Sequence, residues 1–255
     1  MSIYKIYNED CITGSPQHFE DESVDLMICD PPFGIKESTM DKHYNRLDSN
    51  VIGGYIEAPE NYYQFSYDWI TQAKRILKPN GSIYIVSGWT NLLDVLSACR
   101  KIDLFLINHI IWKYNFGVYT SKKFVSSHYH ILYLKKNKKS NPVFNTNCRF
   151  SSSEKSDKNR SLLYSDMEDV WMINKEYKPN QIKNQNKLPE NLVRKIILYS
   201  SNKNDTVCDF FLGNFTTAIV SKKLGRTPAG FEINKNAFDH NMSVLANEGK
   251  TIFDV

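Results

Sequence analysis

Short apolar runs alternate with amphipathic stretches along most of the chain. Six apolar runs bounded by turn residues predict buried strands, at residues 24–29, 82–87, 104–112, 128–134, 206–208 and 228–231. Apolar residues recurring three and four positions apart predict helices, at residues 62–77, 91–100, 189–198, 216–224 and 236–247. Strands separated by helices predict an α/β fold with a doubly wound, mostly parallel sheet, in which the run at 128–134 is the antiparallel neighbour of the run at 104–112.

This pattern is interrupted at two places. Residues 78–81 read Lys-Pro-Asn-Gly, which predicts a turn before the next strand. Between residues 137 and 166 the periodicity fades into Ser, Asn and Lys, which predicts a lobe or long loop inserted between the two halves of the sheet.

Charge is distributed unevenly along the chain. Between Lys113 and Arg160, eleven basic residues stand against two acidic ones, a net charge of +9, whereas the rest of the chain carries −5. A basic surface of this kind suits a polyanion, since each Lys or Arg near a phosphate releases a counterion on binding. A solvated, lysine-rich loop is an equally good interpretation of the charge alone.

Composition limits the class of protein. A chain of 255 residues with 41% apolar side chains can form one large domain with a small lobe, and disorder is excluded as its main feature. No apolar run approaches the roughly 18 residues that a bilayer requires, and the start of the chain does not resemble a signal peptide. The five cysteines are far apart without a C-x-x-C pair, which argues against disulfides and zinc. We therefore expect a cytoplasmic protein.

The first motif with chemical content is Asp30-Pro31-Pro32-Phe33, directly after the strand at 24–29. The carboxyl end of a parallel strand faces the crevice where ligands bind. Two prolines hold the backbone extended and remove two amide donors, which leaves a carboxylate and carbonyl oxygens as acceptors for an amino group. The Phe33 ring offers a surface on which a base could stack. On its own, the motif also fits a Pro-Pro turn closed by an aromatic side chain.

A second motif follows the strand at 206–208. After Asp209 the chain reads Phe210-Phe211-Leu212-Gly213-Asn214-Phe215-Thr216. Gly213 allows a close backbone approach, and Thr216 is a candidate cap for the next helix. Glu232 ends the strand after that, about twenty residues beyond Asp209, where dinucleotide-binding folds place a carboxylate for ribose hydroxyls. Taken alone, Glu232 also fits a surface cap.

Together and in this order, these residues resemble the S-adenosylmethionine-dependent DNA amino-methyltransferases of the beta group, in which the catalytic tetrapeptide precedes the cofactor loop. The resemblance covers nearly the whole chain. It includes residues 23–26, which lead into the first motif, residues 75–81 before the strand at 82–87, Asp169-Val170-Trp171, and Lys187 with Pro189. The sequence departs from the usual Asp-Pro-Phe and Gly-Ser-Gly pattern, because Phe210 replaces a proline and Asn214-Phe215 replace Ser-Gly.

The resemblance implies a Rossmann-like methyltransferase fold with circularly permuted motifs and a mostly parallel, seven-stranded sheet containing one antiparallel strand. It divides the chain into a catalytic half (1–136), an inserted target-recognition region (137–168) and a cofactor-binding half (169–255). The implied catalytic residues are Asp30, Pro31, Pro32 and Phe33. The implied cofactor-binding residues are Asp10, Asp30, Lys187, Asp209, Phe211, Gly213, Asn214, Thr216 and Glu232.

The implied reaction is transfer of a methyl group from S-adenosylmethionine to N6 of adenine in double-stranded DNA, with base flipping and S-adenosylhomocysteine as the product. Asp30 favours adenine, because cytosine-N4 members of the family more often have Ser at this position. Cytosine-N4 methylation, RNA methylation and a non-catalytic nucleic-acid-binding subunit stay open as alternatives. The biological role and a homodimeric state are also open, and we expect neither a metal nor a membrane partner. For His128 and His130, which share one strand face without a Cys or carboxylate partner, we favour a structural or phosphate-facing role over metal binding.

Overall fold

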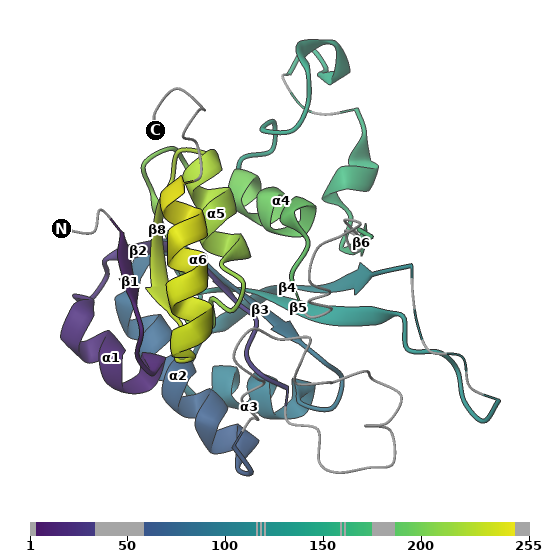
Figure 1. The fold of residues 1–255 in the computed structure, drawn as a ribbon. Coiled ribbons are helices and arrows are strands. Elements are labelled where there is room, and N and C mark those ends of the chain that lie inside the picture. Colours follow the sequence, from purple (N-terminus) through teal and green to yellow (C-terminus); the bar gives the residue numbers. More distant parts are fainter. Residues whose placement is uncertain are drawn as a thin grey trace.

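The computed structural model describes residues 4–33, 59–115, 117, 119, 121–158, 160, 162–174 and 187–247. A central sheet in the order β1-β8-β7-β2-β3-β5-β4-β6 organises this part of the chain (Figure 1). The strands are β1 (Lys5–Tyr7), β2 (Val24–Cys29), β3 (Leu77–Ser87), β4 (Phe105–Lys113), β5 (His128–Lys135), β6 (Val170–Met172), β7 (Thr206–Asp209) and β8 (Thr227–Phe231). The helices are α1 (Cys11–His18), α2 (Tyr62–Ile76), α3 (Leu92–Lys101), α4 (Glu190–Ser200), α5 (Thr216–Lys223) and α6 (Lys235–Asn247).

The predicted α/β class is confirmed, and β5 is the single antiparallel strand within the described residues. It pairs with β3 on one side and β4 on the other, while every other described pair is parallel. The sheet has eight strands instead of the seven expected. The edge strands β1 and β6 contain only three residues each, too few to show a periodicity in the sequence, and they are defined by pairing with β8 and β4.

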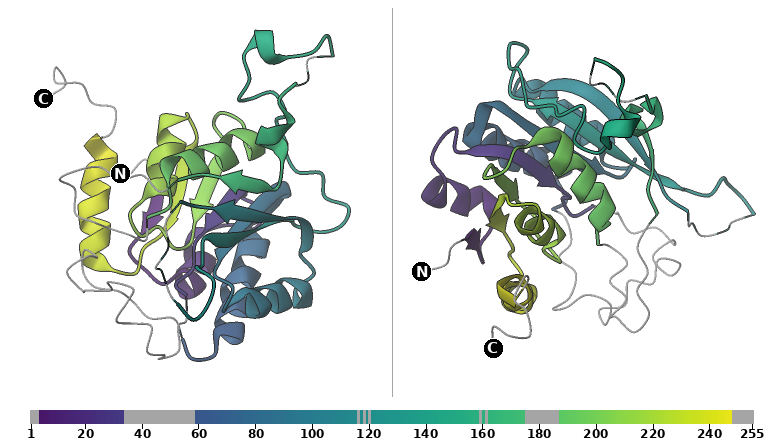
Figure 2. Two further views of the ribbon diagram at one scale, coloured as in Figure 1. Left: turned by 90° about the vertical axis from the view of Figure 1, so that its right-hand side faces the viewer. Right: turned by 90° about the horizontal axis from the view of Figure 1, so that it is seen from above.

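Helices cover both faces of the sheet, which explains why its central strands are almost continuously apolar. Met27 and Cys29 belong to one buried cluster with side chains of α2 and α3, and Leu26 and Ile28 belong to a second cluster with side chains of α4. Figures 1 and 2 show α1, α2 and α3 on one side of the sheet and α4, α5 and α6 on the other. No described helix has the length and apolarity needed to span a membrane.

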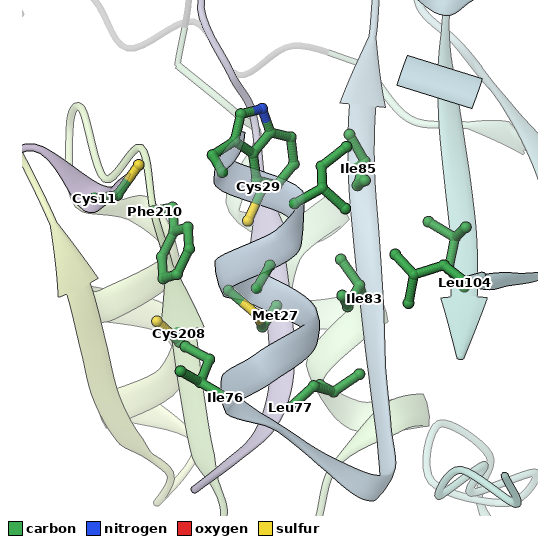
Figure 3. Packing of buried hydrophobic residues seen from close by; sticks show 14 of the residues in the cluster. Cys11, Met27, Cys29, Ile76, Leu77, Ile83, Ile85, Leu104, Cys208 and Phe210 are labelled. Carbon is green, nitrogen blue, oxygen red and sulfur yellow. The ribbon is translucent and has the colours of Figure 1, made fainter. Parts of the chain in front are cut away.

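Four of the five cysteines (Cys11, Cys29, Cys99 and Cys208) lie in the first cluster, and Figure 3 shows Cys11, Cys29 and Cys208 among apolar side chains. All five cysteines of the chain are free thiols. Burial is the main cause that raises the pKa of the Cys29 thiol well above its ordinary value. The buried thiols of this cluster therefore stay protonated and pack as small apolar groups.

The turn predicted at residues 78–81 is wrong, because these residues belong to β3. The register against β2 shifts there, from Val24 opposite Leu77 to Leu26 opposite Ser82. This irregularity in the pairing accommodates the Lys-Pro-Asn-Gly segment within the strand. A Cβ atom at Gly81 would lie 2.8 Å from the backbone oxygen of Asp25. Glycine is therefore required by the close approach of the two strands.

Candidate active site

The predicted site residues gather at one edge of the sheet. The strands β1, β8, β7 and β2 are adjacent and parallel, so their carboxyl ends lie together. Asp10 follows β1, Glu232 follows β8, Asp209 ends β7 and Asp30 follows β2. The topology thus assembles at this edge four carboxylates that are up to 222 residues apart in the sequence, and we call it the active-site edge.

Glu232 joins the ends of three strands. Its Oε2 accepts a hydrogen bond from Gly213 N (2.7 Å) and its Oε1 from Asn234 N (2.8 Å). The side chain of Asn8, after β1, donates to the backbone oxygen of Glu232 (2.7 Å), a contact that the sequence did not predict. Glu232 is only 8% exposed, and this burial raises the pKa of its carboxyl group. Each carboxylate oxygen keeps lone pairs that can accept from hydroxyl groups of a ligand.

Asp209 organises the loop from within the protein. Its Oδ1 accepts from Phe211 N (2.8 Å) and its Oδ2 from the Thr217 hydroxyl (2.7 Å). Burial, the largest cause, raises the pKa of Asp209 to about 7, and nearby Glu232 acts in the same direction. A Cβ atom at Gly230, where φ is +146°, would lie 2.0 Å from the backbone oxygen of Asp209. Gly230 is therefore a second residue that the sequence analysis missed, required for the close contact of β7 and β8.

The loop between β7 and α5 is held from both sides. The Phe211 ring makes edge contacts with Trp69 (5.2 Å) and Phe65 (5.9 Å) of α2. On the other side, Asn241 of α6 donates to the backbone oxygen of Gly213 (3.0 Å). Gly213 itself has a positive φ of +50°, which favours glycine.

The predicted capping role of Thr216 is wrong. Phe215 occupies the N-cap position of α5 in a left-handed conformation, without a side-chain cap, and its ring is fully buried. Thr216 Oγ1 is buried and has no hydrogen-bond partner within the described residues. Such an unsatisfied hydroxyl beside a loop of this kind fits a ligand that carries polar groups.

Asp10 follows β1 at the active-site edge, whereas Lys187 precedes α4. Asp10 Oδ1 caps α1 by accepting from Ile12 N (2.8 Å) and Thr13 N (3.2 Å). This cap helps to explain a helix that the sequence analysis did not predict, because Pro16 lies inside it. Lys187 forms a 3.6 Å ion pair with Glu190 at the start of α4.

The tetrapeptide after β2 leads toward β5. Asp30 Oδ1 and Pro31 are buried, whereas Phe33 is partly buried. The Phe33 ring stacks on Tyr129 of β5, with 5.6 Å between ring centroids and 23° between ring planes. Tyr129 carries no signal of this role in the sequence, because it stands between two histidines on a strand almost 100 residues after Phe33.

The neighbouring histidines lie on the opposite face of β5, because side chains alternate along a strand. His109 Nε2 and His130 Nδ1 are 2.8 Å apart. Burial, followed by the neighbouring His109 and His128, lowers the pKa of His130 to about 4, so it is neutral at pH 7. The described residues contain no group of three or more His, Cys, Asp or Glu side chains placed to hold a metal ion.

The predicted target-recognition region starts at the opposite edge of the sheet, because β5 is antiparallel. Lys135 Nζ donates to the backbone oxygen of Ser140 (2.9 Å), and Lys136 Nζ pairs with Glu22 Oε1 (2.8 Å) just before β2. Further along, Asp166 accepts from Tyr199 (2.5 Å) of α4. The region then leads into β6, which runs parallel to β4 and ends beside Lys113 at the active-site edge. Its lysine-rich start is therefore remote from Asp30.

Fold and site together define an α/β protein with four carboxylates and a glycine-containing loop at the carboxyl edge of a mostly parallel sheet. A family profile described as DNA methylase, N6_N4_Mtase, matches residues 24–243. The chain is 30% identical to the Type II methyltransferase M2.DpnII of Streptococcus pneumoniae over 84% of this chain and 79% of that protein. It is 28% identical to M.HinfI of Haemophilus influenzae over 92% of this chain and 66% of that protein. The chain belongs to the DNA methylase family.

Solved structures of low sequence identity share the fold. An M1.HpyAVI complex with SAM has a TM-score of 0.66 at 20% identity and covers 95% of this chain and 98% of that chain. TTHA0409 of Thermus thermophilus, complexed with S-adenosyl-L-methionine, has a TM-score of 0.68 at 20% identity and covers 96% and 94%. PvuII DNA methyltransferase, which is cytosine-N4-specific, has a TM-score of 0.66 at 14% identity and the same coverage.

Proposed function

We propose that this protein transfers a methyl group from S-adenosylmethionine to N6 of adenine in DNA. The observation that carries the proposal is the position of Asp30-Pro31-Pro32-Phe33 after β2, at the same edge of the sheet as Glu232. Glu232 can accept from ribose hydroxyls, and the loop from Asp209 to Thr216 surrounds the remainder of the cofactor. The cofactor supplies an electrophilic methyl group on a sulfonium.

The tetrapeptide has the chemistry needed to activate an exocyclic amino group. The nitrogen lone pair of adenine N6 is delocalised into the ring, which makes it a weak nucleophile. The Asp30 carboxylate and the backbone oxygen of Pro31 accept hydrogen bonds from the two amino hydrogens and thereby turn the lone pair out of the ring plane. Phe33 stacks on the base after it has left the duplex, and this extrusion costs a few kcal/mol.

Adenine is favoured over cytosine because the tetrapeptide begins with Asp30, whereas cytosine-N4 members of the family more often begin with Ser. Cytosine N4 is the second candidate, because the same acceptor geometry suits its amino group and PvuII DNA methyltransferase shares the fold. The pocket must therefore distinguish a purine from a pyrimidine by size and by the atoms around the amino group.

For target recognition we propose the second part of the inserted region, residues 149–168, together with the loops at the active-site edge. This part leads directly into β6, whose end lies beside Lys113 and the β4–β5 loop. Phosphate contacts by lysines position the duplex, and a few polar side chains read base edges. We place the protein in a reducing, cytoplasmic compartment because its five cysteines are free.

The experiment is methylation of a random-sequence duplex DNA library with radiolabelled S-adenosylmethionine, followed by nucleoside mass spectrometry. We expect N6-methyladenine in DNA and no label with the Asp30→Ala variant. Label in N4-methylcytosine would select the second candidate, and label only in a matched RNA library would reject DNA as the substrate. Methylome sequencing of a host that expresses the chain then gives the recognition sequence.

A further inference from the structure

Phe33 belongs to a group of four aromatic rings. Tyr129 stacks on Phe33 and also contacts Trp112, with 5.5 Å between ring centroids, and Tyr114, with 5.3 Å. Trp112 and Tyr114 contact each other at 5.9 Å. The three rings behind Phe33 therefore come from β4, β5 and the residue that follows β4, and none comes from β2.

This aromatic group is fixed firmly to the sheet. Trp112 is 1% exposed, Tyr114 is 4% exposed, and Trp112 Nε1 donates to the backbone oxygen of Ile173 (2.8 Å). Tyr129 lies opposite Trp112 in the antiparallel register of β4 and β5. Because β5 starts at the active-site edge, its second residue reaches the tetrapeptide. The antiparallel direction of β5 is thus what brings Tyr129 to Phe33.

Phe33 needs such support, since its own backbone supplies little. The ring follows two prolines, which hold the chain extended and donate no backbone hydrogen bonds. Gly88, the residue after β3, lies close to the ring but has no side chain to pack against it, since a Cβ atom there would be 3.9 Å from Phe33 Cγ. The stacking contact with Tyr129 therefore restricts how the Phe33 ring can tilt.

We propose that Tyr129 is a positioning residue for methylation, which holds the Phe33 ring in the orientation that receives the flipped base. The inference rests on the proposed function. Tyr129 occupies one face of Phe33, and the base takes the surface that is left. A base gains stacking energy only from a ring that is already oriented, because ordering the ring at the moment of binding costs conformational entropy.

The test compares the single-turnover methylation rate of wild type with that of five variants at saturating cofactor and DNA. Tyr129→Leu keeps the bulk but removes the aromatic ring, and Tyr129→Phe restores the ring without the hydroxyl. Phe33→Ala and the double variant Phe33→Ala with Tyr129→Leu test whether Tyr129 acts through Phe33. Tyr133→Leu is the matched control, because Tyr133 lies on the same face of β5 but stacks on Tyr84 (4.5 Å).

We expect Tyr129→Leu to reduce the single-turnover rate by about tenfold, since base–aromatic stacking is worth roughly that much. The affinities for S-adenosylmethionine and for DNA should stay unchanged, and Tyr129→Phe should restore the rate. The double variant should be no slower than Phe33→Ala alone, and Tyr133→Leu should keep the wild-type rate.

Additive losses in the double variant, or a Tyr129→Leu variant with the wild-type rate, would overturn the positioning role while leaving the methyltransferase proposal intact. An equal loss of rate in Tyr133→Leu would also overturn it, by showing that the effect comes from general weakening of β5. A wild-type protein that transfers no methyl group to DNA would overturn both proposals, so the two failures are distinguishable.

Discussion

Gly213 N donates a 2.7 Å hydrogen bond to Glu232 Oε2, and this bond joins the loop after β7 to the end of β8. The two residues are 19 positions apart in the sequence. The carboxylate that we propose as the ribose acceptor therefore also holds the backbone of the loop beside it. A change at Glu232 acts on both parts of the cofactor site.

Replacement of Glu232 by Ala should weaken the binding of S-adenosylmethionine by about 1–3 kcal/mol, because charged hydrogen bonds to ribose are lost and Gly213 N loses its acceptor. Isothermal titration calorimetry measures this change. Asp239→Ala is the matched control, since Asp239 is an exposed acid on α6 that pairs only with Lys235 among the ion pairs described. Equal affinity of Glu232→Ala and wild type would remove Glu232 from the cofactor site.

The Asp30→Ala variant should lose methylation but retain binding of S-adenosylmethionine, because Asp30 is assigned to the amino group of the base. Asp30→Asn separates charge from shape, since the amide keeps one acceptor oxygen and loses the negative charge. We expect it to retain a small residual rate. Filter-based methyl transfer and calorimetry measure the two properties separately, and a near wild-type rate in Asp30→Ala would contradict the assignment.

Asp209 should make the protein less stable as the pH rises. Its pKa is about 7 in the folded protein against an ordinary value of 3.8, so the folded state binds more protons between these values. Its contribution is fully present below pH 3.8 and is lost as the pH rises through about 7.

His130 has the opposite effect on stability, because its pKa is lowered from 6.5 to about 4 in the folded protein. Its contribution to the free energy of unfolding is therefore lost as the pH falls. The difference between wild type and Asp209→Asn therefore isolates the carboxyl group. We expect the stability of the variant relative to wild type to increase from pH 4 to pH 8, because only wild type loses the contribution of the raised pKa of Asp209 in this range. Urea unfolding measures this, and parallel profiles would contradict the raised pKa.

The lysines just after β5 should contribute little to DNA binding. Lys135, Lys136, Lys138 and Lys139 belong to the basic stretch that could suit a polyanion, but Lys135 and Lys136 bond to protein groups at the edge of the sheet opposite Asp30. Neutralising these four should leave the salt dependence of DNA binding unchanged. Lys122 and Lys123 are exposed in the β4–β5 loop. Neutralising them should reduce the slope of the logarithm of the binding constant against the logarithm of the salt concentration, by about 0.9 for each DNA phosphate contact that is lost.

Fluorescence anisotropy at several salt concentrations measures both slopes, with equal affinity for S-adenosylmethionine as the control for folding. If only the fourfold variant changed its slope, the DNA-binding face would have to include the amino ends of the parallel strands. The comparison therefore decides between the two edges of the sheet.

Local sequence determined the long elements and the chemistry of the two motifs. Buried strands such as β2 and amphipathic helices such as α2 produce clear periodicities, because each must place apolar side chains toward one or both faces of the same sheet. Asp30 and Glu232 were found because each follows directly after such a strand, where a parallel sheet exposes its side chains.

Tertiary structure decided the features that depend on contacts between distant segments. The three-residue strands β1 and β6 exist through pairing with β8 and β4, and residues 78–81 join β3 because β2 lies beside them. The antiparallel direction of β5 places Lys135 far from the site and Tyr129 against Phe33. Neither position follows from the composition of the strand, because a sequence determines which residues are apolar but the packing of the sheet determines which end of each strand faces the ligand.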